Sequence, residues 1–338
     1  MVVIHDLEYE YKYKLIDMVL ERPESPMRSC TVALLVEPIE LYVRDFHDLL
    51  LLKQTGKTND EISRKLVEIL LALNNEDTQK LKELYEVSFE SPIKKDIEIV
   101  LDETSIVSKL LNALLQGKRC EEPNNSTSIA KTIAKKLYEA GEGTPGIDYN
   151  TFIKIFTHDS FSQLSAIFDI YEDLYKRPIQ EAIEREFQGR SETECFQDIV
   201  QFTRSPGNYY AKILRQSFEK TPMDYITIIR TIIGHEDKDL DEIKLEYSKI
   251  YDETLEQTVQ KRVDFPEMKR LFTKILNKGS EDTSEDNGPV RFDHANNSSS
   301  ATYSSAPTTP PGYNGIRRNR SHEAFDKFVN VFKTMRPH

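Results

Sequence analysis

The residues that most resemble a reactive motif form a short glycine-rich stretch, Gly141-Glu142-Gly143-Thr144-Pro145-Gly146. Its glycines fit the G-x-G-x-x-G spacing with which dinucleotide-binding folds bring the backbone close to a pyrophosphate. That chemistry requires a β-strand before the glycines and a βαβ unit around them. The preceding residues, 129–139, instead have the apolar periodicity of an amphipathic helix. We therefore do not expect a dinucleotide site.

Other motifs that carry catalysis are missing from the sequence. Gly56-Lys57-Thr58 ends like a phosphate-binding loop, but Leu51 stands where the first glycine of that loop belongs. The seven histidines form no HExxH pattern, and no Ser/His/Asp or Cys/His order stands out. The three cysteines are widely spaced and include no CxxC pair, which favours a reducing compartment. We expect that the protein is not an enzyme.

The charge of the chain narrows the choice of partners. It contains 45 Lys and Arg and 57 Asp and Glu, for a net charge of −12 at pH 7. Because an acidic protein is a poor counterion for phosphate, we expect no nucleic-acid partner. An acidic membrane would also repel it unless a bound cation bridged the two surfaces. No apolar run approaches the roughly 20 residues of a spanning helix, and residues 1–10 hold no signal-peptide core, so a cytoplasmic protein is predicted.

A ladder of apolar residues spaced four apart recurs along the chain, which is typical of the buried stripe of an amphipathic helix. Its aligned aromatic residues, Tyr11, Phe89, Tyr175 and Tyr251, lie 78, 86 and 76 residues apart. Such regular intervals indicate a structural repeat. The four ladders are Tyr11, Leu15 and Val19; Tyr85, Phe89, Ile93 and Ile97; Tyr171, Tyr175, Ile179 and Ile183; and Tyr247, Tyr251, Leu255 and Val259.

A threonine that could cap a helix precedes three of the ladders. Thr58, Thr144 and Thr221 lie 31, 31 and 30 residues before the aligned aromatic residue. Threonine is a favourable N-cap, and the proline after Thr144 and Thr221 suits the first turn of a helix. No alternating strand pattern bounded by hairpin turns is evident. We predict an all-α repeat array whose first unit is partial, since no such threonine precedes its ladder.

Taken together, the ladders and loops resemble the annexin family. The third unit, FIKIFTHDSFSQLSAIFDIYEDLYKRPIQEAIEREFQGR, is most similar, and the second and fourth units follow it, through KLKELYEVSFESPIKKDIEIVL and DLDEIKLEYSKIYDETLEQTVQKRV. The resemblance covers roughly residues 7–277. It implies five-helix repeats that assemble into a curved disc. It also implies a convex face that binds Ca²⁺ and, through it, acidic phospholipid.

The resemblance and the local composition divide the chain into seven segments. The tail is rich in Ser, Asn, Pro and Gly and has too few apolar residues to fold, so we expect disorder there. The predicted segments are a partial repeat at 1–39, repeats at 40–117, 129–203 and 204–277, a linker at 118–128, a disordered tail at 278–320 and an amphipathic helix at 321–336.

The predicted terminal helix has one apolar face. It could insert into a membrane interface, bind a protein partner or pack against the repeats of its own chain. The face consists of Phe325, Phe328, Val329, Phe332 and Met335.

The annexin resemblance also implies a set of calcium ligands. In that family, carbonyl oxygens of a Gly-x-Gly-Thr loop act with a carboxylate about one helix pair downstream. Ca²⁺ takes six to eight oxygen ligands, so water or lipid phosphate can fill the remaining positions. Matched to this chain, the ligands are the carbonyls of Glu139, Gly141 and Gly143 and the side chain of Glu186.

The other repeats depart from this pattern. The second loop contains Lys57, whose charge opposes a cation, although Asp102 and Glu103 lie near the carboxylate position. The fourth loop, Ser217–Thr221, lacks the glycines, and Arg262 falls where the acid belongs. A single calcium site, in the third repeat, is therefore expected.

Two functions follow from these patterns. The leading hypothesis is calcium-dependent peripheral binding to acidic, phosphatidylserine-like membranes, with Ca²⁺ bridging the third loop and lipid phosphate. The alternative is an annexin-fold scaffold that needs no calcium and binds proteins or lipid through its C-terminal helix. Loss of the calcium pattern from the other loops favours the alternative, and the third loop could also be a plain turn that leads into a helix.

Overall fold

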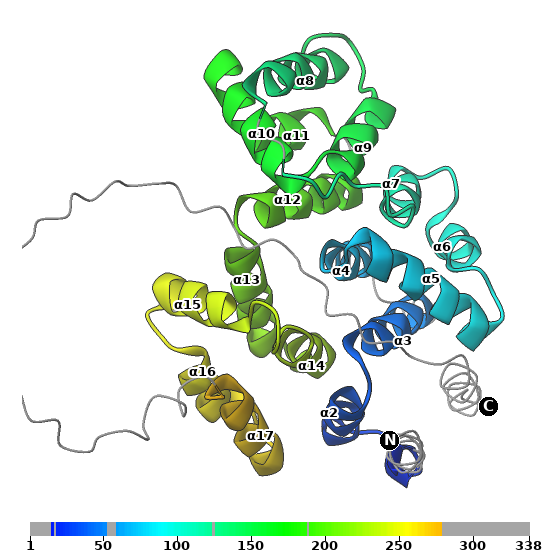
Figure 1. Ribbon diagram of the computed structural model, residues 1–338, viewed down its shortest axis with the longest axis vertical. Coiled ribbons are helices and arrows are strands. Elements are labelled where there is room, and N and C mark those ends of the chain that lie inside the picture. The colour runs from blue at the N-terminus through cyan, green and yellow to red at the C-terminus, as the bar shows by residue number, and fades with distance from the viewer. Residues whose placement is uncertain (1–14, 17, 53–58, 124–125, 188, 279–338) are drawn as a thin grey trace, which may run out of the picture.

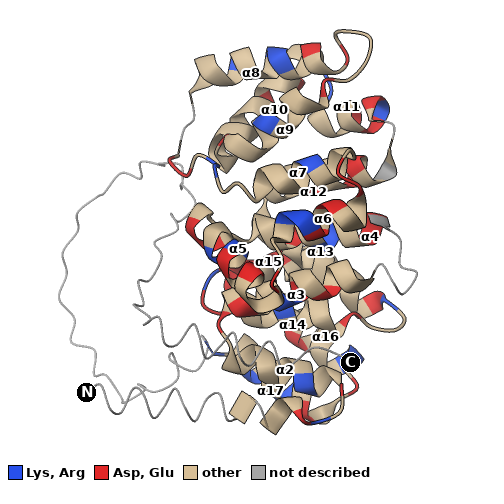
Figure 2. Cartoon of the chain, turned by 90° about the vertical axis from the view of Figure 1, so that its right-hand side faces the viewer, with Lys and Arg blue, Asp and Glu red and all other residues tan. Residues whose placement is uncertain are grey.

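The computed structural model describes residues 15–16, 18–52, 59–123, 126–187 and 189–278. All regular elements in this part of the chain are helices, so the predicted all-α class is confirmed. Figure 1 shows the helices grouped around the point where α4, α12, α13 and α14 meet, and Figure 2 shows them stacked along the long axis. The predicted tail at 278–320, apart from Lys278, and the predicted terminal helix at 321–336 lie outside the described residues, as do Tyr11, Lys57 and Thr58.

The helices fall into repeats along the sequence. The first comprises helical residues 15–16 and 18–20 followed by α2 (Pro26–Leu35). The second contains α3 (Pro38–Leu51), α4 (Asn59–Leu71), α5 (Asn75–Phe89), α6 (Ile93–Leu101) and α7 (Ile106–Leu114). The third contains α8 (Thr127–Ala140), α9 (Tyr149–His158), α10 (Phe161–Tyr175), α11 (Ile179–Glu186) and α12 (Arg190–Arg204). The fourth contains α13 (Pro206–Glu219), α14 (Tyr225–Gly234), α15 (Leu240–Tyr251), α16 (Leu255–Arg262) and α17 (Pro266–Leu276).

The backbone repeats with the intervals of the sequence ladder. Helix α10 has the length of α5 displaced by 86 residues, and α16 has the length of α11 displaced by 76. Three helices, α5, α10 and α15, end in a left-handed residue, Glu90, Lys176 and Asp252, again 86 and 76 residues apart. A left-handed residue ends a helix by turning the chain away from its axis. The repeats therefore share both their helices and the turns between them.

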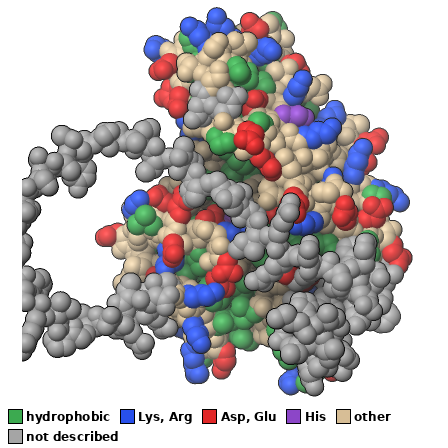
Figure 3. Space-filling model, in the orientation of Figure 1, with side chains coloured by type: hydrophobic (Ala, Val, Ile, Leu, Met, Phe, Trp, Pro, Cys, Tyr) green, Lys and Arg blue, Asp and Glu red, His purple; other side chains and the backbone are tan. Residues whose placement is uncertain are grey.

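The ladder residues of the second to fourth repeats form the core, as predicted, whereas Leu15 of the first ladder is exposed. Tyr85, Tyr171 and Tyr247 are fully buried, and the aliphatic ladder residues of the second to fourth repeats are buried with them. The aligned aromatic residues Phe89 and Tyr175 pack at the edge of this core. Helices α4 and α12 are in extensive contact, so the cores of neighbouring repeats join. On the outer face in Figure 3, acidic and basic side chains are interspersed.

The assignment of Thr144 and Thr221 as N-caps is wrong. Helix α9 begins four residues later, and α14 three residues later, than a threonine cap would require. Asp148 and Asp224 cap them by accepting a hydrogen bond from a backbone amide. The hydroxyl of Thr144 instead donates to the carbonyl of Glu139, 2.6 Å away. Aspartate competes well for the cap position, and its hydrogen bond fixes where the helix starts.

Residues 118–123 connect the second and third repeats through specific contacts. The guanidinium of Arg119 donates to the carbonyls of Phe156 and Asp159, at 2.8 and 2.7 Å, at the end of α9. Its backbone amide donates to the side chain of Asn75, whose own amide group donates back to the Arg119 carbonyl. Positive charge at a helix C-terminus is favourable, and these bonds fasten the connection to both neighbours.

Candidate metal site in the third repeat

The glycine-rich loop joins α8 to α9 and is closed by its own backbone. Gly141 ends α8, and the amide of Gly143 donates to the carbonyl of Tyr138 at 2.7 Å. On the far side of the loop, the amide of Asp148 donates to the carbonyl of Ala140 at 2.8 Å. These bonds bring the two ends of the loop together, so its carbonyl groups stand at the C-terminal end of α8. This is the end at which the helix dipole favours a cation.

Gly143 is required by close packing. A Cβ atom there would lie 3.0 Å from the ring and the carbonyl oxygen of Tyr138, closer than side chains normally approach. Tyr138 cannot move away freely because its ring stacks on that of Tyr175, with centroids 4.0 Å apart. Only glycine therefore fits this position without a shift of the loop.

Glu142 anchors the loop to the next helices. Its carboxylate is only 8% exposed and accepts hydrogen bonds from the hydroxyl of Tyr171 at 2.8 Å and from Nη1 of Arg177 at 2.5 Å. Nη1 of Arg185 lies 3.5 Å from the same carboxylate. Burial, together with the hydrogen bond to Glu142, raises the pKa of Tyr171. Glu142 is thus committed to structure and is not available to a metal.

The predicted carbonyl ligands retain acceptor capacity. The carbonyl of Glu139 accepts from the Thr144 hydroxyl at 2.6 Å, and that of Gly141 accepts from the Thr144 amide at 3.4 Å. Each carbonyl oxygen has two lone pairs, so one remains at both residues. The Gly143 carbonyl accepts no hydrogen bond from any residue that the structure describes.

Glu186, the predicted carboxylate ligand, is the last residue of α11 and is partly exposed. Its neighbour Arg185 reaches Glu142 in the loop, so this end of α11 lies against the loop. Within the described residues, Glu186 itself makes no hydrogen bond or ion pair. A carboxylate at this end of α11 that has no partner of its own suits a cation.

The oxygen donors at this loop fit Ca²⁺ by their chemistry. Carbonyl and carboxylate oxygens are hard ligands, and Ca²⁺ tolerates a flexible arrangement of them. Among the described residues, no three Asp, Glu, His or Cys side chains gather closely enough to hold a metal by themselves. A cation at the loop would therefore depend on the backbone oxygens as well as on Glu186.

Known proteins match this chain over most of its length. The annexin family model matches residues 133–195, which include the loop and Glu186. Annexin A13 of Mus musculus is 30% identical over 254 residues, which cover 75% of this chain and 77% of that protein. The chain belongs to the annexin family. Annexin B10 of Drosophila melanogaster is 29% identical over 272 residues, covering 80% of this chain and 81% of that protein.

Solved annexin structures share the fold. Annexin III superposes with a TM-score of 0.70 at 24% identity, over 78% of each chain. The calcium-bound annexin (Sm)1 gives a TM-score of 0.66 at 18% identity, over 78% of this chain and 76% of that one. Annexins in general bind phospholipid membranes in a calcium-dependent manner and are typically not enzymes. No helix in the described part of this annexin is long and apolar enough to cross a bilayer.

The fourth annexin repeat replaces the metal pattern with an ion pair. Arg262 ends α16 as Glu186 ends α11, 76 residues earlier. Its Nη2 lies 3.6 Å from Oε1 of Glu219, which stands 76 residues after Gly143. Arg215 also pairs with Glu219, at 2.6 Å, and with Glu253, at 3.0 Å. A guanidinium therefore stands at the helix position that carries a carboxylate, Glu186, in the third repeat.

The second annexin repeat is described only in part. Residues 53–58 of its loop, with Lys57, lie outside the described residues. Asp102, near the carboxylate position, accepts hydrogen bonds from the amide and the hydroxyl of Thr104, at 2.8 and 2.7 Å. These hydrogen bonds form a local turn at the end of α6, where the backbone of Asp102 has a positive φ of 65°.

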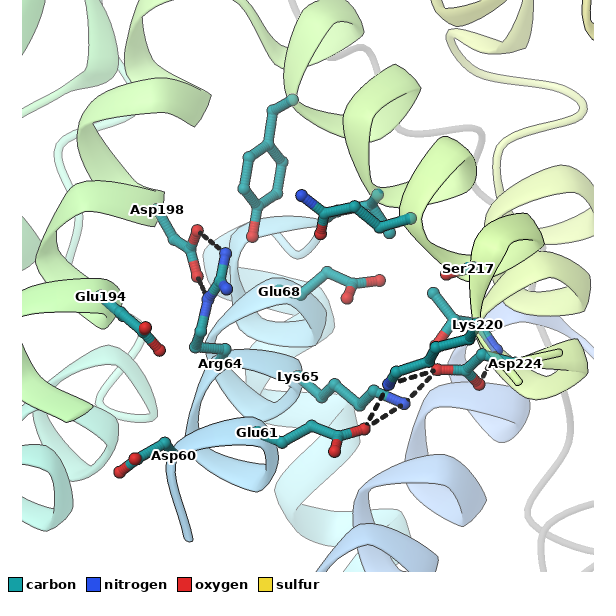
Figure 4. Close-up of a pocket in the computed structure, with 14 residues that line it drawn as sticks. Asp60, Glu61, Arg64, Lys65, Glu68, Glu194, Asp198, Ser217, Lys220 and Asp224 are labelled. Atoms are coloured by element: carbon teal, nitrogen blue, oxygen red, sulfur yellow. Dashed lines mark hydrogen bonds and ion pairs between the residues drawn. The ribbon is translucent and has the colours of Figure 1, made fainter. Parts of the chain in front are cut away.

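A second charged region, which sequence reasoning missed, lies between the repeats. It is a cavity of about 470 Å³ lined by α4, α12, α13 and α14 (Figure 4). Arg64 forms two 2.8 Å hydrogen bonds with Asp198, and Lys220 pairs with Glu61 at 2.5 Å. These pairs join residues far apart in the sequence, so no local motif reveals them.

Three further ion pairs fasten the fourth repeat to the second. Arg230 is buried between Asp45, at 2.8 Å, and Glu68, at 2.7 Å. Asp224 pairs with Lys65 at the cavity wall. Burial alone would raise the pKa of Asp224, but the lysine charges outweigh it and lower this pKa to about 2. These ion pairs at the cavity wall hold the repeats together.

Proposed function

We propose that this annexin binds acidic, phosphatidylserine-like membranes peripherally, from the cytoplasm, through a single calcium site in its third repeat. The ligands from the protein are the carbonyls of Glu139, Gly141 and Gly143 and the carboxylate of Glu186. The observation that carries the proposal is the unpaired Glu186 at the end of α11, beside a loop whose other acid, Glu142, is fully occupied. Family membership supports the same function.

The loop is arranged before a metal arrives. Tyr171 and Arg177 hold Glu142, and the closed backbone holds the carbonyls, so little ordering is needed on binding. A preorganised site binds more tightly than one that must first be ordered. Calcium, when bound, supplies the positive charge that offsets the repulsion between an acidic protein and an acidic membrane. Its free coordination positions suit a lipid phosphate oxygen.

A site with one carboxylate is expected to be weak in the absence of lipid. Its dissociation constant should fall near about 10⁻⁴ to 10⁻³ M, as in calcium modules of low charge. Isothermal titration calorimetry of the whole protein with CaCl₂ measures this dissociation constant. One saturable site should disappear in Glu186→Gln and persist in Glu184→Gln, because Glu184 is an exposed acid of the same helix. Equal calcium binding by the two variants would remove Glu186 from the site.

A second function is favoured by one observation, the ion pair of Arg262 with Glu219. It closes the fourth repeat without a metal, as expected of an annexin-fold scaffold that no longer needs calcium. Such a scaffold would bind proteins or lipid through the predicted helix at 321–336. Deletion of residues 317–338 would then abolish recruitment, whereas Glu186→Gln would leave recruitment unchanged.

A further inference from the structure

The helical residues before α2 expose a position that is buried in every other repeat. Leu15 is 45% exposed. The equivalent residues, displaced by the repeat intervals of 78, 86 and 76, are Ile93, Ile179 and Leu255, which are 3%, 0% and 0% exposed. In those repeats the residue starts a short helix and faces the core of its own bundle. At Leu15 the same apolar position faces outward.

Two more apolar side chains reach the surface in this repeat. Met18 is 63% exposed and lies three residues after the exposed leucine, on the same side of a helix. Leu34, on α2, is 43% exposed. The later repeats carry polar residues at the equivalent position, namely Asn112, Asp198 and Lys274. We call the surface formed by Leu15 and Met18 the first-repeat face. Exposed apolar side chains that break a repeat pattern in this way indicate an interaction surface.

We propose that the segment 321–336 of the same chain docks on the first-repeat face. Its apolar residues fall at positions i, i+3, i+4 and i+7 from Phe325, which is the pattern of an amphipathic helix that lies in an apolar groove. The side chains of Phe325, Phe328 and Phe332 would cover the exposed apolar side chains of Leu15 and Met18. We expect the segment to form a helix that covers the exposed apolar side chains of the first repeat. In the other repeats the residues equivalent to Leu15 are buried within their own bundle.

Charge favours the same occupant. Residues 317–338 contain six Lys and Arg and two Asp and Glu, so they carry +4, whereas the remainder of the chain carries −16. The turn that leads into α2 contains Glu21 and Glu24, but it also contains Arg22, and Glu24 pairs with Arg28 at 2.9 Å. The attraction therefore comes from the net charges of the segment and of the rest of the chain. Opposite charges of this kind steer a segment to its site and weaken as salt is added.

The chain also delivers the segment to the right end of the molecule. Helix α17 packs against α2 and α14, and Figures 1 and 2 both show α17 and α2 at the same end of the array. The 42 residues from 279 to 320 then span about 35 Å if they behave as a flexible chain. A tether of that length keeps the segment at an effective concentration near millimolar, so modest affinity suffices.

Hydrogen exchange in the full-length protein, in chelator and without lipid, tests this docking. Phe328→Asp/Phe332→Asp places charge on the apolar face, and Asn330→Asp/Thr334→Asp places the same charge on the opposite face of the helix. We expect amides of residues 18–35 to exchange at least threefold faster in the phenylalanine variant only. Exchange in α10, far from the face, should match wild type in both variants.

A change on the body side must give the matching result. Met18→Glu should speed exchange in residues 321–336, and added salt should do so as well. Unchanged exchange at residues 18–35 in the phenylalanine variant would overturn the proposal. Protection that rises with protein concentration would assign the face to a second copy, and protection that needs phosphatidylserine vesicles would assign the segment to the membrane. Because calcium is absent throughout, the result is independent of the calcium site.

Discussion

Arg262 in the fourth repeat occupies the position that Glu186 holds in the third, and its guanidinium lies 3.6 Å from Glu219. The two residues end helices of equal length, α16 and α11. One position thus carries an unpaired acid in one repeat and a paired base in the other. This contrast explains how a single array can contain one loop suited to a cation and another that is closed without one.

Restoring the third-repeat pattern in the fourth repeat should add a metal site. In Glu219→Gly/Arg262→Glu the ion pair is removed, a glycine is introduced at the end of α13, and a carboxylate replaces the guanidinium. We expect half-maximal binding to phosphatidylserine vesicles at a severalfold lower calcium concentration. Exposed ion pairs contribute only about 0–1 kcal/mol, so the fold should survive. An unchanged calcium midpoint in a folded variant would show that these two positions do not define the site.

Substitution of Glu142 and substitution of Glu186 should affect stability and calcium binding differently. Glu142→Gln loses the charge that Arg177 and Tyr171 hold in a nearly buried position, so the free energy of unfolding should fall by roughly 1–2 kcal/mol. Glu186→Gln removes a partly exposed, unpaired charge and should change it by less than about 0.5 kcal/mol. Urea unfolding in chelator measures both.

Calcium binding by the same two variants should be affected in the reverse order, with the larger loss in Glu186→Gln. Glu142→Gln should keep a saturable site because its role is to hold the loop, whereas Glu186→Gln should lose it. A Glu142→Gln variant of normal stability that no longer binds calcium would contradict a purely structural role for Glu142.

The pair of Asp224 and Lys65 should make stability depend on pH. The pKa of Asp224 is lowered to about 2, from an ordinary 3.8, so the unfolded chain takes up this proton first as pH falls. The stabilisation is therefore complete above about pH 4 and is lost as pH falls toward 2. Asp224→Asn should cost about 2 kcal/mol at pH 7 and at pH 5, and progressively less below pH 4. Urea unfolding across this range checks the prediction, and a pH-independent difference would be inconsistent with it.

The three cysteines should differ in reactivity. Cys120 is exposed, whereas Cys30 and Cys195 are buried. Burial raises the pKa of the Cys30 thiol to about 12 and that of Cys195 well above its ordinary value. Because the thiolate is the reactive form, a maleimide should modify one thiol in the native protein and three in urea. Mass spectrometry should locate the native adduct at Cys120, and rapid native labelling of Cys195 would contradict the packing of α12.

The repeat array could be predicted from sequence because its signal is local. Residues four apart share a helix face, so the ladders of Tyr85 and Tyr171 are visible without any knowledge of the fold. The helix starts were misplaced because two residue types compete for the cap. Thr144 looked suitable before Pro145, but Asp148 accepts the amide hydrogen bond.

The supporting contacts of the site could not be predicted in the same way. Glu142 fills the variable position of its motif, and its partners Tyr171 and Arg177 lie 29 and 35 residues away. The ion pairs between repeats are more distant still, with 185 residues between Asp45 and Arg230. Such pairs are set by how the repeats pack, which the spacing of residues within one helix does not reveal.

Co-sedimentation with phosphatidylserine vesicles tests the central claim most directly. Wild type, Glu186→Gln and the control Glu184→Gln would each be measured in millimolar calcium and in chelator. We predict that wild type and the control pellet only with calcium and that Glu186→Gln requires at least tenfold more. Pelleting of wild type in chelator would favour the terminal helix as the membrane contact. Equal calcium dependence in Glu186→Gln and wild type would contradict a calcium site at the third-repeat loop.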